Sequence, residues 1–410
     1  MTTTKNNEHK KLNAPNKQEQ NQTCLDSAER EGLRPKGNVP NLRFKEFEGE
    51  WKEERLADIA DLYKGTGISK DQLSDDGEPC ILYGELYTKY KSETIREVIS
   101  KTNIDNTKLV RSKANDVIIP CSGETAEDIA TARCVLNGNI LLGGDLNIIR
   151  LHGYDGAFMS YQLNGKRKYD IAKVAQGVSV VHLYGEHLKG VKTINPCLEE
   201  QKKIASLLAL LDERIANQNK IIDKLQSLIK GIRNDVFGKL RKDIGLNAKV
   251  GDVLSYEQPQ PYIVEDTEYT AGGTPVLTAN KAFVLGYTSE TDGIYDKGDC
   301  IIFDDFTLDC KYVDFPFKVK SSAIKILTAK NKELLRYTFE FLKYLDLSTD
   351  EHKRHYIAET QNQEFILPTT QIVRTIAHAF STLSSRMQTI VKQRDMLELQ
   401  KQYLLRQMFI

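Results

Sequence analysis

Residues 198–237 carry apolar side chains that step by four and three along the chain. Such an a/d heptad pattern places these side chains on one stripe of a helix and is typical of a coiled-coil face. The pattern predicts one long helix over 196–242, begun by Pro196 and with Gly238 after its last apolar residue. The predicted pairing seam comprises Ile204, Leu208, Leu211, Ile215, Ile222, Leu225, Ile229 and Ile232.

A second heptad run closes the chain and predicts another long helix over 368–410. It aligns with the first run without a gap at an offset of 172, so that Pro196 matches Pro368 and Phe237 matches Phe409. A helix with an apolar stripe needs a partner, and we expect the two runs to pair as an antiparallel coiled coil. The second seam comprises Ile376, Phe380, Leu383, Met387, Ile390, Leu397 and Leu404.

The remaining segments, 39–195 and 243–367, consist of short β-rich runs broken by Gly, Asn and Asp, with a helix expected near 157–173. The strand-like runs of the first segment return in the second, where the first is Asp252-Val253. We therefore expect an α+β fold of two tandem α/β domains separated by two long helices, produced by duplication. The looser matches between the domains pair Asp58 with Asp252, Pro79 with Pro275, and Asp116 with Asp299.

Composition narrows the class of protein. Residues 1–38 are almost entirely polar and cannot bury enough apolar surface to fold, so we expect a disordered tail. Lys+Arg and Asp+Glu number 57 each, so only local charge can favour a partner, and each long helix carries a net charge of about +4. The seven cysteines are scattered, and no apolar run approaches the ~20 residues of a membrane span. We expect a soluble, cytoplasmic protein.

Several stretches together resemble the specificity subunit of a type I restriction–modification enzyme. They are the leader Val39–Phe44, Ser122–Thr125, Gly143–Asn147, Pro196–Ala205, Ile222–Leu225 and Phe303–Thr307. The resemblance implies two target-recognition domains, each reading one half of a split site in double-stranded DNA, and helices that dock two methyltransferase subunits. It also implies motor-nuclease subunits in the restriction complex, with S-adenosylmethionine, ATP and Mg²⁺ held by partner subunits and no cofactor by this chain. The second helix start departs from the family pattern at Pro368–Ile372.

Polar loops supply the candidate DNA contacts, because base edges and phosphates are read by Lys, Arg, Asn, Gln, Ser and Thr side chains. In the first domain the candidates are Lys64, Thr66, Tyr87, Lys89 and Tyr90. In the second they are Gln258, Gln260, Lys281, Tyr287 and Lys311.

Two other classes of protein stay open at this point. One is a self-sufficient methyltransferase or nuclease; Asn195-Pro196 begins like a methyltransferase motif, and Asp304, Asp305, Asp309 and Lys311 could be read as a Mg²⁺ site. A helix start and a strand-end loop are the simpler interpretations of these residues. The other class is a coiled-coil scaffold that does not touch DNA. Signatures of nucleotide hydrolysis, zinc proteolysis and esterase chemistry are missing from the sequence.

Overall fold

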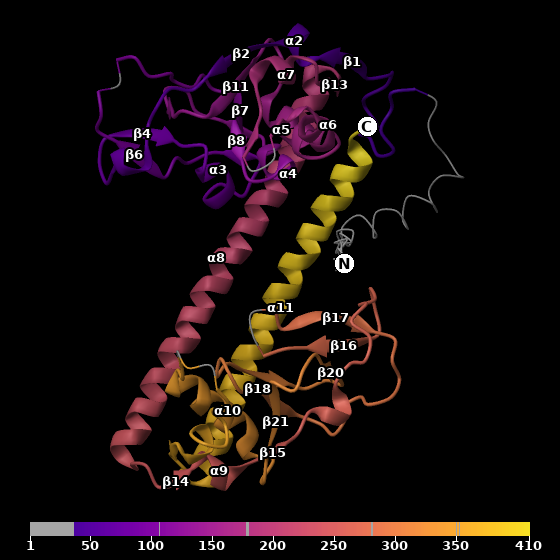
Figure 1. Ribbon diagram of the computed structural model, residues 1–410. Coiled ribbons are helices and arrows are strands. Elements are labelled where there is room, and N and C mark those ends of the chain that lie inside the picture. Colours follow the sequence, from indigo (N-terminus) through magenta and orange to yellow (C-terminus); the bar gives the residue numbers. More distant parts are fainter. Residues whose placement is uncertain (1–36, 106, 178–179, 280–281, 350, 352) are drawn as a thin grey trace, which may run out of the picture. The chain divides into compact units, whose positions relative to one another are not determined.

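The computed structural model describes residues 37–105, 107–177, 180–279, 282–349, 351 and 353–410. The chain divides into two compact units (Figure 1). The first unit ends at Arg214 and also includes Leu397–Ile410, whereas the second unit is Ile215–Met396. The predicted disordered tail lies outside the described residues up to residue 36.

Two long helices contribute to both units, α8 (Leu198–Asp243) and α11 (Thr370–Met408). Together with two domains of mixed sheets and short helices, they give the predicted fold class (Figure 1). Among the described residues, no helix is both long and apolar enough to span a lipid bilayer.

Within each unit the two long helices run in opposite directions. In the first unit the start of α8 shares a hydrophobic cluster with the end of α11, through Leu208 and Met408. In the second unit the end of α8 shares a core with the start of α11, through Phe237 and Val373. All predicted seam side chains are buried or half-buried, whereas Leu210 and Leu228 of α8 are exposed.

The first domain is built on a five-stranded sheet in the order β2-β11-β7-β9-β5 and a four-stranded sheet in the order β10-β4-β6-β3. Two ribbons, β1-β13 and β8-β12, complete it. The strands are β1 (Lys52–Arg55), β2 (Ala60–Lys64), β3 (Leu73–Ser74), β4 (Glu78–Ile81), β5 (Thr94–Ile95), β6 (Ser100–Thr102), β7 (Asp116–Pro120), β8 (Ser122–Gly123), β9 (Arg133–Val135), β10 (Leu141–Leu142), β11 (Leu146–Leu151), β12 (Val181–His182) and β13 (Lys192–Asn195). The short helices are α2 (Leu56–Ile59), η1 (Lys70–Gln72), α3 (Glu85–Thr88), α4 (Ala126–Ile129), α5 (Gly156–Asn164), α6 (Lys168–Val174) and α7 (Gly185–Lys189).

The second domain repeats this plan with fewer strands. Its sheets have the orders β15-β21-β18-β19 and β17-β16-β20, with a ribbon β14-β22. The strands are β14 (Ala248–Lys249), β15 (Leu254–Glu257), β16 (Thr274–Leu277), β17 (Val284–Thr288), β18 (Cys300–Asp304), β19 (Cys310–Val313), β20 (Lys318–Val319), β21 (Ile324–Ala329) and β22 (Glu364–Phe365). The helices are α9 (Val250–Val253), η2 (Gln260–Tyr262), α10 (Leu334–Leu345) and η3 (Thr360–Asn362).

Strand registers show how the two domains correspond. Leu151 of β11 faces Ala60 of β2, and Ala329 of β21 faces Leu254 of β15, so the offset of 194 that pairs Asp58 with Asp252 holds along this strand. The pairing of Asp116 with Asp299 is wrong by one residue. The registers of the central strands show that Asp116 of β7 is equivalent to Cys300 of β18.

Two other expectations also need correction. The single helix expected near 157–173 is broken into α5 and α6, because the chain turns at Gly165, which caps α5. Asp252-Val253 ends the short helix α9 rather than forming a strand, and the Asp252 carboxylate accepts a hydrogen bond from the Lys249 amide at its start.

The beginning of α8 is held by a buried ion pair. Glu200, in the first turn, is fully buried and binds the Arg43 guanidinium of the leader through two 2.7 Å contacts. The hydrogen bond from Arg43 to this carboxylate is the main reason that the pKa of Arg43 is raised. At the equivalent position of α11, Ile372 is partly exposed, which is the structural consequence of the weakened second motif.

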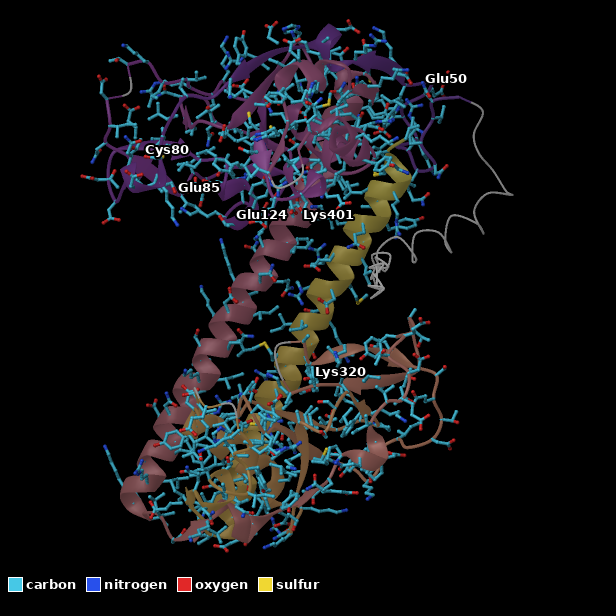
Figure 2. The ribbon with its side chains drawn as sticks, viewed as in Figure 1. Glu50, Cys80, Glu85, Glu124, Lys320 and Lys401 are labelled. Atoms are coloured by element: carbon cyan, nitrogen blue, oxygen red, sulfur yellow. The ribbon has the colours of Figure 1, made fainter. Side chains whose placement is uncertain are left out.

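A buried polar cluster joins α11 to the first domain. The Lys401 ammonium (Figure 2) lies 2.6 Å from both the Glu93 and the Asp212 carboxylates, and the three side chains are 15%, 13% and 9% exposed. The Tyr161 hydroxyl donates to Asp212 at 2.7 Å. Burial favours a lower pKa for Lys401, but attraction by the two carboxylates outweighs it and raises the pKa.

Replacing Lys401 with Met should therefore destabilise the protein strongly, because two buried carboxylates would be left without their cation. Breaking a buried ion pair in this way costs about 3–5 kcal/mol. Urea unfolding of Lys401→Met against Arg406→Met, an exposed position on the same helix, measures the difference. Since the pKa of Lys401 is raised, its stabilisation is present at neutral pH and should be lost only above about pH 10. Equal unfolding midpoints for the two variants would contradict this account of the cluster.

Candidate nucleic-acid interface

Five side chains of the first domain gather where the central strands end. We call Lys64, Cys121, Ser122, Asn147 and His182 the strand-end cluster. Lys64 is opposite Asn147 across β2 and β11, and His182 is opposite Ser122 across β12 and β8. The two pairs are joined by the segment after β12, because the Asn147 side-chain amide donates to the carbonyl of Leu183 at 2.9 Å. The Leu183 amide in turn donates to the carbonyl of Cys121 at 2.8 Å.

Glycines allow two loops to approach each other beside this cluster. A Cβ atom on Gly65 would lie 2.0 Å from the carbonyl oxygen of Gly143, so only glycine fits there without a backbone shift. Gly67, in the same loop, has open space around its would-be Cβ. This backbone packing fixes the part of the loop from which the exposed side chains of Lys64 and Thr66 project.

Aromatic side chains border the cluster. The Tyr184 ring is 53% exposed and stacks on His182, with ring centroids 6.2 Å apart and an interplanar angle of 27°. The His187 ring meets Tyr184 edge-on at 5.5 Å. The Tyr87 hydroxyl donates to the backbone carbonyl of Ser122 at 3.2 Å. An exposed lysine, hydroxyl groups and stacked rings are the side-chain types that contact phosphates and bases.

Burial keeps the Cys121 thiol and the neighbouring Tyr87 hydroxyl neutral at physiological pH. It raises the pKa of Cys121 to about 11, against the opposing effect of the Lys64 charge, so the thiol is not an activated nucleophile. Burial likewise raises the pKa of Tyr87 above its usual value. The chemistry of this surface is hydrogen bonding and stacking.

The second domain places different side chains at the equivalent positions. Its strand-end cluster consists of Gln258, Asp305, Phe306, Lys325 and Arg354, and the amide of His355 donates to the Asp305 carbonyl at 3.0 Å. The nearly buried Lys325 ammonium donates to the Gln258 side chain at 3.0 Å and lies 3.6 Å from the Asp305 carboxylate. The Arg354 guanidinium lies 5.7 Å from the centre of the Phe306 ring.

The predicted contact residues of the first domain lie in three kinds of place. Lys64 belongs to the strand-end cluster, and Thr66 and Tyr87 lie beside it; the Thr66 hydroxyl also accepts the amide of Val110. Lys89 is exposed, but its ammonium binds Glu85 and Ser100, each at 2.7 Å. Tyr90 must be corrected: it is 6% exposed and lies in the hydrophobic core, so it is not an exposed loop residue.

The candidates of the second domain are more dispersed. Gln258 belongs to the strand-end cluster, and Gln260 is exposed in η2. Tyr287 is 38% exposed on β17, in the other sheet of the domain. Lys311 is half-buried on β19, and its ammonium is 3.0 Å from the Asp309 carboxylate. Lys281 lies outside the described residues.

The carboxylates that suggested a nuclease are occupied by structural interactions. Asp304 accepts the amides of Phe306 and Thr307 in a tight turn, and Asp305 accepts the amides of His355 and Tyr356. Asp309 is also paired with Lys343. Within the part of the chain that the structure describes, no group of His, Cys, Asp and Glu side chains is arranged to hold a metal ion.

Residue-by-residue interpretation of the sequence missed Asn147, His182, Lys325 and Arg354. For His182 and Arg354 a signal was present in the repeat, because the offset of 172 that aligns the long helices also aligns His182-Leu183-Tyr184 with Arg354-His355-Tyr356. Only one of these three positions carries the same residue in both copies, so the match was invisible without the hydrogen bonds.

Comparison with known proteins agrees with the sequence motifs. Residues 48–227 match the family "Type I restriction modification DNA specificity domain". The EcoR124I/EcoR124II specificity subunit of Escherichia coli is 45% identical over 126 residues, which are 29% of this chain and 31% of that protein. The MjaVIII specificity subunit of Methanocaldococcus jannaschii is 27% identical over 202 residues, or 48% of this chain and 45% of that protein. The matches thus span less than half the length of these two relatives.

The fold of most of the chain also has a solved counterpart. The crystal structure of a type I restriction–modification S subunit from M. genitalium has a TM-score of 0.65, covers 91% of this chain and is itself covered to 99%, at 17% identity. The fold of this chain is therefore similar to that of this S subunit. The comparisons confirm the resemblance drawn from the sequence: residues 48–227 match the type I DNA specificity domain, and the chain is similar to the specificity subunits of such enzymes.

The close approach of Gly65 and Gly143 yields a direct test of how the site is built. Gly65→Ala should force the two backbones apart and lower the free energy of unfolding by about 1–3 kcal/mol, the usual cost of overpacking. Gly67→Ala, which meets open space, should change it by no more than about 0.5 kcal/mol. Urea titrations of the two variants measure both values. If Gly67→Ala proved as costly as Gly65→Ala, loop packing would not hold the site.

Proposed function

We propose that this chain is the DNA sequence-specificity subunit of a type I restriction–modification complex, and that each domain reads one half of a bipartite site in double-stranded DNA. The observation that carries the proposal is the specificity-domain match over residues 48–227, because it includes the whole strand-end cluster of the first domain. The second cluster stands on the same backbone framework with different side chains. Two domains that share one backbone framework but expose different side chains suit an asymmetric bipartite site.

The catalytic steps would then belong to partner subunits. We infer that two methyltransferase subunits supply S-adenosylmethionine chemistry and that motor-nuclease subunits supply ATP- and Mg²⁺-dependent cleavage in the cytoplasm. This chain would bind none of these cofactors. The neutral Cys121 thiol and the occupied Asp304 and Asp305 carboxylates support a non-catalytic role.

The long helices offer apolar surface to such partners. Large apolar side chains on both helices remain outside the seam and are exposed by about half or more of their surface. They are Leu210, Ile221 and Leu228 of α8, and Met396, Leu399 and Tyr403 of α11. Apolar side chains repeated along one helix favour protein partners over solvent. They also favour the alternative of a coiled-coil scaffold, which the strand-end clusters do not support.

The first test uses the complete system in cells. A genome methylated by this chain and its methyltransferase subunit should show one asymmetric motif made of two specific parts and a nonspecific spacer. Methylation that requires no partner subunit would favour the self-sufficient enzyme, and methylation independent of this chain would refute the proposal.

Lys64 provides the residue-level test. In binding titrations with the assembled methyltransferase, Lys64→Gln should act on one half-site only. A base contact is worth ~1–3 kcal/mol of discrimination, whereas a phosphate contact weakens binding to all sequences and lowers the salt slope by about one. Duplexes varied in one half-site at a time, at two salt concentrations, separate these cases. Lys192→Gln, an exposed lysine on β13, is the control. Equal loss of preference in both half-sites would contradict independent readers.

A further inference from the structure

The two strand-end clusters share a backbone hydrogen-bond pattern that identifies equivalent residues. The Cys121 amide donates to the Asp145 carbonyl at 2.7 Å, and the Asp305 amide donates to the Ala323 carbonyl at 2.8 Å. The carbonyls of Cys121 and Asp305 accept the amides of Leu183 and His355, respectively. Leu183 and His355 are therefore equivalent positions, separated by 172 residues.

His182 and Arg354 precede these two residues and thus occupy the same place in the two domains. Both are exposed, and the Arg354 side chain keeps 49% of its surface accessible although its guanidinium donates to the Ser322 carbonyl at 3.2 Å. In each case the side chain lies beside a ring, Tyr184 for His182 and Phe306 for Arg354. In both copies this position therefore presents an exposed side chain from a backbone that hydrogen bonds hold in place.

The surrounding side chains maintain that backbone by different means. In the first domain the side-chain amide of Asn147 holds the segment after His182 by donating a hydrogen bond to the carbonyl of Leu183. In the second domain the Asp305 carboxylate holds the segment after Arg354 by accepting two amides, at 3.1 and 2.8 Å. Its charge is balanced by the Lys325 ammonium at 3.6 Å and by the Arg354 guanidinium at 3.7 Å. The two domains keep the same backbone arrangement although different side chains hold it. This indicates that the position of the exposed residue matters, whereas its identity can differ between the domains.

We propose that His182 and Arg354 are the equivalent specificity-determining residues of the two domains, each reading a base edge in its own half-site. This inference rests on the proposed function. A guanidinium pairs best with guanine, through O6 and N7, whereas a glutamine side chain pairs with adenine through N6 and N7. Arg354 therefore reads guanine at one position of the half-site that belongs to the second domain, and His182 reads the corresponding position of the other half-site.

The experiment selects duplexes from a pool randomised at every position, using the full chain assembled with its methyltransferase subunit. Arg354→Gln should replace guanine by adenine at one position of one half-site, with discrimination changed roughly 5- to 150-fold, the equivalent of ~1–3 kcal/mol. Arg354→Lys should retain guanine. His182→Ala should relax one position of the other half-site. Each variant should leave the salt dependence unchanged, because a base contact releases no counterion from a phosphate.

Matched controls lie beside β11 and β21, the strands that carry Asn147 and Lys325, at the ends that are far from the two clusters. His152 follows β11, and Lys330 follows β21; their amides donate to equivalent carbonyls, of Ile59 and Val253, so they too are equivalent positions. His152→Ala and Lys330→Gln should select the wild-type motif. Variants must first match the wild-type thermal unfolding midpoint, so that loss of folding is not mistaken for loss of reading.

The outcomes separate the inference from the function beneath it. If the wild-type complex selects no motif, the proposed function fails. If it selects a bipartite motif that Arg354→Gln and His182→Ala leave unchanged, only the assignment of these two residues is overturned. A uniform loss of affinity with a salt slope lowered by about one would make Arg354 a phosphate contact and would also overturn it.

Discussion

The apolar stripe on each long helix is the constraint on which the other features depend. A helix of 46 residues such as α8 gains little stability on its own, and its heptad side chains must be covered by another apolar surface. In each unit that cover comes from the other long helix together with the domain core. Phe409 at the end of α11 stacks on Phe158 at 5.1 Å in the first unit, and Phe237 near the end of α8 packs against Tyr337 and Phe341 in the second. The same aromatic device therefore anchors both helix ends.

Charges embedded along the stripe add specificity that apolar contacts lack. An apolar seam alone tolerates shifts by whole heptads, whereas Lys401 finds its two carboxylates in one register only. In the second unit Arg394 reaches the side chain of Asn219 at 3.4 Å from an otherwise apolar seam position. Both cations interrupt the heptad pattern of α11, and both find partners at these places. Lys401 and Arg394, the charged residues within the apolar pattern, thus specify the register in which the two helices pair.

Helix periodicity and the repeat could be predicted from the sequence because they depend on local pattern and on comparison within the chain. The central strands β7 and β18 also lie in the two segments where the sequence predicts short β-rich runs. The break at Gly165 was not, since one glycine within a helical pattern does not decide between a kink and an end. Tyr90 was misjudged for a related reason: a tyrosine in a polar run can face either way, and only the fold shows that its ring lies in the core.

The candidate site was harder to predict because its residues come from four separate segments in each domain, joined by hydrogen bonds to the backbone. Lys64 and Gln258 were found since exposed polar residues after a strand are conspicuous, but His182 and Arg354 lie in segments with no distinctive composition. Their equivalence depends on the amides of Leu183 and His355, and backbone bonds leave no trace in side-chain identity. The two copies keep the backbone hydrogen bonds that the fold requires, whereas their exposed side chains differ. Under the proposed function the two domains read different half-sites with one backbone framework, and their differences then lie at positions where that framework is most alike.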